Sequence, residues 1–120
     1  MKTTSNENYQ VIEQKACSTK DWNAWINMFP PAPAVLHVHG QVEVPNPGVE
    51  ALLRKRVPQG INPKVLLLDL ILVQRPGIWP EIITLVPAQY HELVDGAQYD
   101  QVQIFCDNQS IETIDVQIIA

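Results

Sequence analysis

The chain has 120 residues, of which 46% are hydrophobic and 18% charged, and its formal net charge at pH 7 is −5. This length predicts a single domain with one core, and the composition excludes a largely disordered chain. A net negative charge leaves few lysines and arginines to bind phosphate groups. We therefore expect neither nucleic acid nor an anionic membrane as a partner.

The N-terminal segment is polar. Residues 1–8 show no hydrophobic periodicity and are expected to form a disordered tail, whereas residues 9–12 suggest a short strand. The segment lacks the apolar region of a secretory signal, so a cytoplasmic location is expected if Met1 is the native start. No apolar run approaches the roughly 20 residues of a membrane-spanning helix.

A short amphipathic helix is predicted at about 19–29. Four apolar residues follow one another at the spacing i, i+3, i+4 and i+7, namely Trp22, Trp25, Ile26 and Phe29. Three prolines at positions 30, 31 and 33 would end this helix, because proline lacks the amide donor and disfavours helical geometry in the residue before it.

The remainder of the chain predicts strands separated by turns. The strand-like ranges are 36–44, 49–53, 65–73, 81–92, 99–106 and 111–118. With no crossover helices between them, they favour an antiparallel, immunoglobulin-like β-sandwich of about six to seven strands that makes residues 9–120 one domain. The strands around the turn 45–48 are expected to form a hairpin, and so are those around 107–110. Pro87 would kink its strand or confine it to a sheet edge.

His37 and His39 are the main candidates for a metal site. Residues i and i+2 of a strand project from one face, so two imidazoles could bind one zinc or copper ion, with His91 as a third ligand. Glu43 or Asp69 could complete the set. The His-Val-His spacing resembles the copper-ligand strand of copper–zinc superoxide dismutases, although their other metal-ligand motifs are absent. The alternative is that these histidines are ordinary solvent-facing residues of an alternating strand.

Enzymatic signatures are otherwise missing. Asp69 lies within an apolar strand, where it could act as a general acid or base, but pairing with a lysine or arginine is the preferred interpretation. No nucleophile elbow and no phosphate-binding glycine motif occurs. Cys17 and Cys106 fit no metal-ligand spacing and are expected to be buried or free thiols, with their pairing left open.

The loop 74–80 is the third candidate site. It places Trp79 and Arg75 among prolines, where a stiffened aromatic side chain could anchor a partner. Alternatively, Trp79 folds back and packs against the end of the sheet. Arg75-Pro76, Trp79 and the turn at Asn46-Pro47-Gly48 resemble loop motifs of chagasin-like protease inhibitors, which are immunoglobulin-like domains of similar length, although in another order.

The leading hypothesis from the sequence is a non-catalytic binding or protein-interaction module that uses the loops 45–48, 58–63 and 74–80. The alternative is a metal-binding protein or small metalloenzyme built on His37 and His39. A third hypothesis is self-association through a sheet edge or through the face that bears Leu52.

Overall fold

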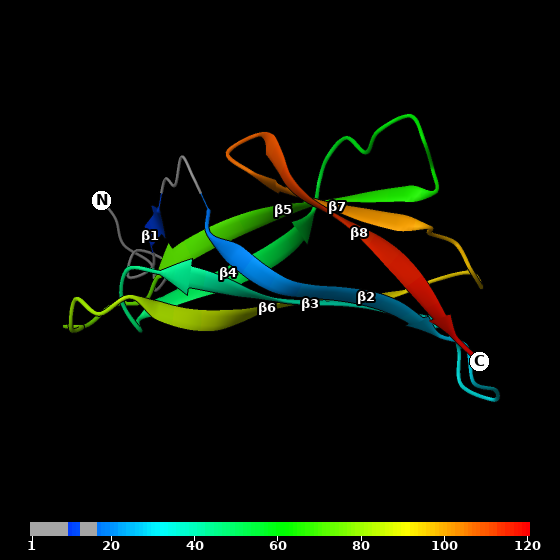
Figure 1. Cartoon of the computed structure of the whole chain (residues 1–120), viewed down its shortest axis with the longest axis horizontal. Helices are drawn as coiled ribbons and strands as arrows, with labels where there is room; N and C mark the ends of the chain where they lie inside the picture. The colour runs from blue at the N-terminus through cyan, green and yellow to red at the C-terminus, as the bar shows by residue number, and fades with distance from the viewer. Residues whose placement is uncertain (1–9, 13–16) are drawn as a thin grey trace, which may run out of the picture.

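The computed structural model describes residues 10–12 and 17–120, and in these ranges all regular structure is β (Figure 1). The predicted all-β class is therefore confirmed, with eight strands in place of six to seven. The strands are β1 (Gln10–Ile12), β2 (Thr19–Asn27), β3 (Val35–Val44), β4 (Val49–Lys55), β5 (Val65–Gln74), β6 (Thr84–Leu93), β7 (Gln101–Cys106) and β8 (Gln109–Ile119).

The strands form one mixed sheet that curls into a half-barrel. The hydrogen-bonded order is β1-β5-β7-β8-β2-β3-β6, and β4 pairs with β5. β8 joins the two halves, because residues 109–115 pair with β7 whereas residues 116–119 pair with β2. In Figure 1, β8 runs diagonally from the layer of β5 and β7 to the opposite layer of β2, β3 and β6.

The expectation of purely antiparallel pairing is wrong at two places. β2 runs parallel to β8, and β5 runs parallel to β7. Both parallel pairs join strands that are distant in sequence, and alternation within a strand contains no information on such pairing. The immunoglobulin-like sandwich remains a prediction.

The core lies between the two halves of the curled sheet. In β3 and β5 every second side chain is buried, as the period of two along a strand requires. The fully buried side chains with the largest volumes are Ile26, Leu36, Val38, Val42, Val44, Val49, Leu66, Leu68, Val102 and Ile104. The outer face of β3 is thereby left to its polar residues.

The predicted helix at 19–29 is wrong, because residues 19–27 form the strand β2 and residues 28–29 follow it without regular structure. Its apolar residues belong to two faces of a strand. Trp22 and Ile26 pack on the core side, where an added Cβ at Gly40 would collide with the Trp22 ring, whereas Trp25 stands on the outer face. Apolar residues on both faces of the strand thus imitate the helical spacing, and the bulge at Asp21 (φ 59°) lies before this pattern.

The turns differ in part from expectation. The predicted hairpin across 45–48 is wrong, because β4 pairs with β5 and β3 pairs with β2 and β6. The hairpin between β7 and β8 is confirmed. Asp107 and Asn108 both have positive φ, which is the geometry of a two-residue type I′ turn. β6, which contains Pro87, lies at the end of the strand order and is thus an edge strand, as predicted.

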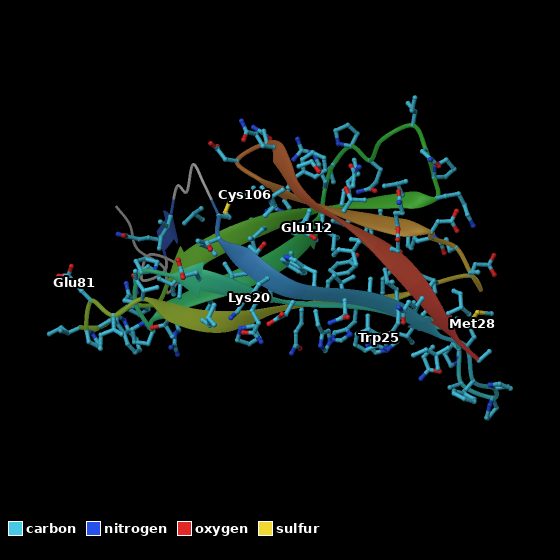
Figure 2. All side chains as sticks on the ribbon, in the orientation of Figure 1. Lys20, Trp25, Met28, Glu81, Cys106 and Glu112 are labelled. Carbon is cyan, nitrogen blue, oxygen red and sulfur yellow. A yellow bond between two sulfur atoms is a disulfide. The ribbon has the colours of Figure 1, made fainter. Side chains whose placement is uncertain are left out.

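A disulfide bond joins Cys17, just before β2, to Cys106 at the end of β7. The two residues are 89 positions apart in sequence, and the sulfur atoms appear as the yellow bond near Cys106 in Figure 2. The expectation of buried or free thiols is therefore wrong, and the pairing that the sequence leaves open is present. The predicted tail at 1–8 lies outside the described residues, and in the described ranges no helix could span a membrane.

Candidate metal centre

The histidines of β3 project from the outer face of the sheet. Leu36 and Val38 point into the core, so the residues that alternate with them, His37 and His39, must point outward. Both imidazole-bearing residues are half-buried rather than exposed. The prediction that these two histidines share one face is confirmed.

The neighbouring strands bring two further rings to this face. In the antiparallel register, His91 of β6 lies opposite His37 on one side, and Trp25 of β2 lies opposite it on the other. Directly opposed residues of antiparallel strands have Cβ atoms roughly 4.5–5.5 Å apart, which is within contact distance for rings. Figure 2 places Trp25 on the side of β2 that faces away from β5 and β7.

The three histidines form one cluster, here called the histidine cluster (His37, His39 and His91). The Nδ1 atoms of His37 and His91 are 2.8 Å apart, and one ligand atom from each of the three residues lies within 4.8 Å of the others. The chain contains three histidines, so all of them are in this cluster. The predicted third ligand, His91, is therefore in position.

Trp25 forms one wall of the cluster. Its ring stacks on that of His37, with centroids 5.1 Å apart and planes at 17°, and its centroid is 5.0 Å from that of His39. Burial lowers the pKa of His37, and the positive charges of His91 and His39 lower it further. Both causes favour the neutral imidazole, which is the form that binds metals.

The Nε2 atom of His39 is buried and has no hydrogen-bond partner among the described residues. A buried polar atom without a partner costs about 1–3 kcal/mol, so proteins rarely retain one without a reason. A ligand that accepts the lone pair of an imidazole nitrogen would remove this cost. A partner for this nitrogen would have to come from outside the described residues.

The donor set fits zinc or copper. Imidazole nitrogens bind Zn²⁺ at about 2.0–2.1 Å, which in tetrahedral geometry separates two nitrogens by roughly 3.3 Å. The observed pair at 2.8 Å and the limit of 4.8 Å bracket this separation, so small side-chain rotations would suffice. Three protein ligands would leave one position open to solvent, as in catalytic zinc sites.

The two carboxylates proposed as a fourth ligand lie elsewhere. Neither Glu43 nor Asp69 belongs to the group of potential ligands that the described residues form. Asp69 instead accepts a hydrogen bond from Arg56 Nη1 at 2.5 Å, and the Arg56 guanidinium also stacks over Phe105. The prediction that Asp69 is paired with a basic residue is confirmed.

Trp79 and Arg75 form a separate, closed arrangement. The Trp79 indole donates a hydrogen bond to the Arg75 carbonyl oxygen (3.1 Å), and the Arg75 guanidinium lies 4.8 Å from the Trp79 ring centroid. The same ring packs so closely on Gly48 that a Cβ there would collide with it. Trp79 thus folds back onto the turn 45–48, which was the alternative to an exposed anchor.

Sequence reasoning missed Trp25 as part of the site. The sequence predicts a helix at this position, and no local pattern indicates that the segment pairs with the strand of His37. A strand interpretation of 19–27 would have put Trp25 on the outer face, opposite Ala24 and Ile26.

Comparison with known proteins gives no further guidance, because no family model matches the chain and neither a curated protein nor a solved structure matches it. Its function is therefore argued from its own residues.

Proposed function

We propose that this protein binds a single zinc or copper ion through His37, His39 and His91. The observation that carries the proposal is the convergence of three imidazoles from two strands, with one nitrogen from each within 4.8 Å of the others. Two of these residues are 54 positions apart in sequence, so only the pairing of β3 with β6 brings them together.

The surroundings of the cluster support metal binding over a purely structural role. A hydrogen-bonded imidazole pair would account for His37 and His91, but it leaves Nε2 of His39 without a partner. Burial and the neighbouring imidazoles lower the pKa of His37, so a metal ion would meet less competition from protons at neutral pH. Trp25 would shield one side of the ion from water.

The open coordination position determines what the bound ion could do. Zinc with three histidine ligands and one exchangeable position can bind water and lower its pKa, and copper with the same ligands can bind a small exogenous ligand. Among the described residues, the group of potential ligands contains the three histidines and no aspartate, glutamate or cysteine. The proposal is therefore metal binding, with no reaction assigned to the ion.

Isothermal titration with Zn²⁺ and Cu²⁺ at pH 7.5 tests the proposal. We expect one ion per chain, and we expect His37→Ala to weaken binding by at least about 100-fold, because two imidazoles remain. His91→Gln is the sharper variant, since glutamine retains hydrogen-bonding capacity but is a poor ligand for these ions.

Asp95→Asn is the matched control, because it changes a polar side chain in the turn after β6 without touching the cluster. Stoichiometric binding should survive in this variant. Binding that is equally tight in His91→Gln would refute the three-histidine site, and so would the absence of binding in the parent chain.

A second candidate function, protein interaction through the 74–80 loop, has a separate observation in its favour. Ile78 is fully exposed, and Ile82 and Ile83 farther along the same connection are also exposed. The contacts of Trp79 with Arg75 and Gly48 would hold Ile78 outward. Loss of a pulled-down partner on Ile78→Ser would support this function, and an unchanged set of partners would contradict it. An immunoglobulin-like fold would be compatible with either function.

The disulfide bears on the compartment. Cystines persist in oxidising compartments and are rare in the cytosol, so Cys17–Cys106 favours an oxidising location over the cytoplasmic one expected from the sequence. Mass spectrometry of the protein alkylated directly in cells would distinguish the two. Two modified cysteines would indicate a reducing compartment.

A further inference from the structure

A groove opens where β8 leaves β2. The two strands pair in parallel only where residues 24–27 of β2 lie beside residues 116–119 of β8. On the N-terminal side of this stretch, β8 pairs with β7 instead. The gap is a groove of about 520 Å³, here called the β2–β8 groove. It shares His39 and the neighbouring Trp25 with the histidine cluster, but His37 and His91 do not line it.

The charge in this groove is negative and unbalanced. Its lining includes Glu112 and Asp115 of β8 but no lysine or arginine. Within the described residues neither carboxylate has an ion-pair partner, although Asp115 accepts a hydrogen bond from the Gln101 amide at 3.1 Å. The chain as a whole adds a net charge of −5, which strengthens the attraction for cations.

Two indole rings line the groove, Trp22 from the core side of β2 and Trp25 from its outer face. Trp22 and Trp25 are both half-buried, so part of each ring is accessible. Trp22 is held by a hydrogen bond from its Nε1 to Thr19 Oγ1 (2.9 Å) and by packing against Gly40. Rings fixed in this way offer a binding surface at little entropic cost. The indole face also attracts cations through its quadrupole, more strongly than the other aromatic side chains do.

We propose that the β2–β8 groove binds a small organic cation, such as an alkylammonium or quaternary ammonium group. A ligand seated in the gap between the two strands would contact the Trp22 indole from the core side and the Trp25 indole from the outer face, and Glu112 and Asp115 would balance its charge. This combination of aromatic faces with carboxylates is the chemistry that recognises such ligands. The inference does not depend on the metal site, because Glu112 and Asp115 are not among the potential metal ligands.

Isothermal titration with tetramethylammonium chloride, at low salt and with a chelator present, tests the inference. We expect saturable binding with a dissociation constant on the order of 1 mM, weakened severalfold as the salt concentration rises. Tert-butanol has a similar size and shape but no charge, so it should bind at least tenfold more weakly. Glu112→Gln, at an exposed position, should weaken binding of the cation about fivefold.

Two control variants separate this site from others. Glu81→Gln makes the same charge change at the far end of the molecule from the groove (Figure 2) and should leave the affinity unchanged. His91→Gln should weaken metal binding by at least about 100-fold without changing the affinity for the organic cation, because His91 does not line the groove. Equal affinity for tert-butanol, or an unchanged affinity in Glu112→Gln, would overturn the inference.

Discussion

The histidine cluster and the 74–80 loop each place a tryptophan beside nitrogen-bearing side chains, but only in the loop do the buried polar atoms have hydrogen-bond partners. In the loop, the indole nitrogen of Trp79 has a carbonyl acceptor, and the Arg75 guanidinium has both the ring and the carboxylate of Glu50 nearby. In the cluster, Nε2 of His39 is buried with no partner within the described ranges.

This difference separates a structural contact from a candidate site. A local arrangement that satisfies its own polar groups gains nothing from a ligand, whereas a buried nitrogen without a partner is stabilised by one. The two regions thus reverse the order of preference that the sequence suggested, in which binding through the loops 45–48, 58–63 and 74–80 was preferred over metal binding. Whether a buried polar atom has a hydrogen-bond partner depends on tertiary contacts. It therefore cannot be predicted from the local sequence pattern.

Reduction of the disulfide should have the largest effect, and it should act on both regions alike. A closed loop with a separation of 89 residues reduces the entropy of the unfolded chain, which corresponds to about 4–5 kcal/mol. We expect the free energy of unfolding to fall by that order in a Cys17→Ala, Cys106→Ala double variant, measured by urea denaturation. A change below about 1 kcal/mol would show that the bond does not support this fold.

Trp79→Ala should separate the two regions. The indole is half-buried and packs on Gly48, so its removal should lower the free energy of unfolding by about 2 kcal/mol. Zinc or copper affinity should remain within about twofold of the parent, because the loop does not contact the cluster. A parallel loss of metal affinity would mean that the two regions are coupled, and the comparison between them would fail.

A pH dependence of stability in the metal-free protein should be the smallest effect. Burial, together with the charges of His91 and His39, lowers the pKa of His37 in the folded state, so the unfolded chain binds the proton more readily. This contribution is fully present above the unfolded value near 6.5, and it is lost as the pH falls through the lower folded value. Denaturant midpoints between pH 8 and pH 5 should therefore decrease, and the decrease should be smaller in His37→Gln.

If the denaturant midpoint of His37→Gln decreased with pH as much as that of the parent, His37 would not be the titrating group. A matched variant at an exposed carboxylate outside the cluster, Asp95→Asn, should retain the full decrease between pH 6.5 and pH 5. The comparison isolates the proton on His37 from the general loss of carboxylate charge at low pH.

Much of the fold could be predicted from the sequence, because alternation of apolar and polar residues is a local signal. It placed β3, β5 and the β7–β8 hairpin close to their observed bounds. It failed at β2, where tryptophans on both faces of the strand produced a helical spacing. The parallel pairs with β8 and β7, and the disulfide, depend on contacts between distant segments that alternation does not encode.

The site was predictable only in part for the same reason. His37 and His39 share a face because they are two residues apart in one strand, and this spacing can be seen in the sequence. The place of His91 opposite His37, and of Trp25 on the other side, depends on the registers of β6 and β2 against β3. The β2–β8 groove depends on the departure of β8 from β2 and had no counterpart in the sequence.

A crystal structure determined after soaking with zinc, and a second after soaking with copper, tests the central claim most directly. We predict one ion bound at about 2.0–2.1 Å by a nitrogen from each of His37, His39 and His91, with Trp25 still stacked on His37. Crystals that diffract well but show three unligated imidazoles at saturating metal would contradict the claim.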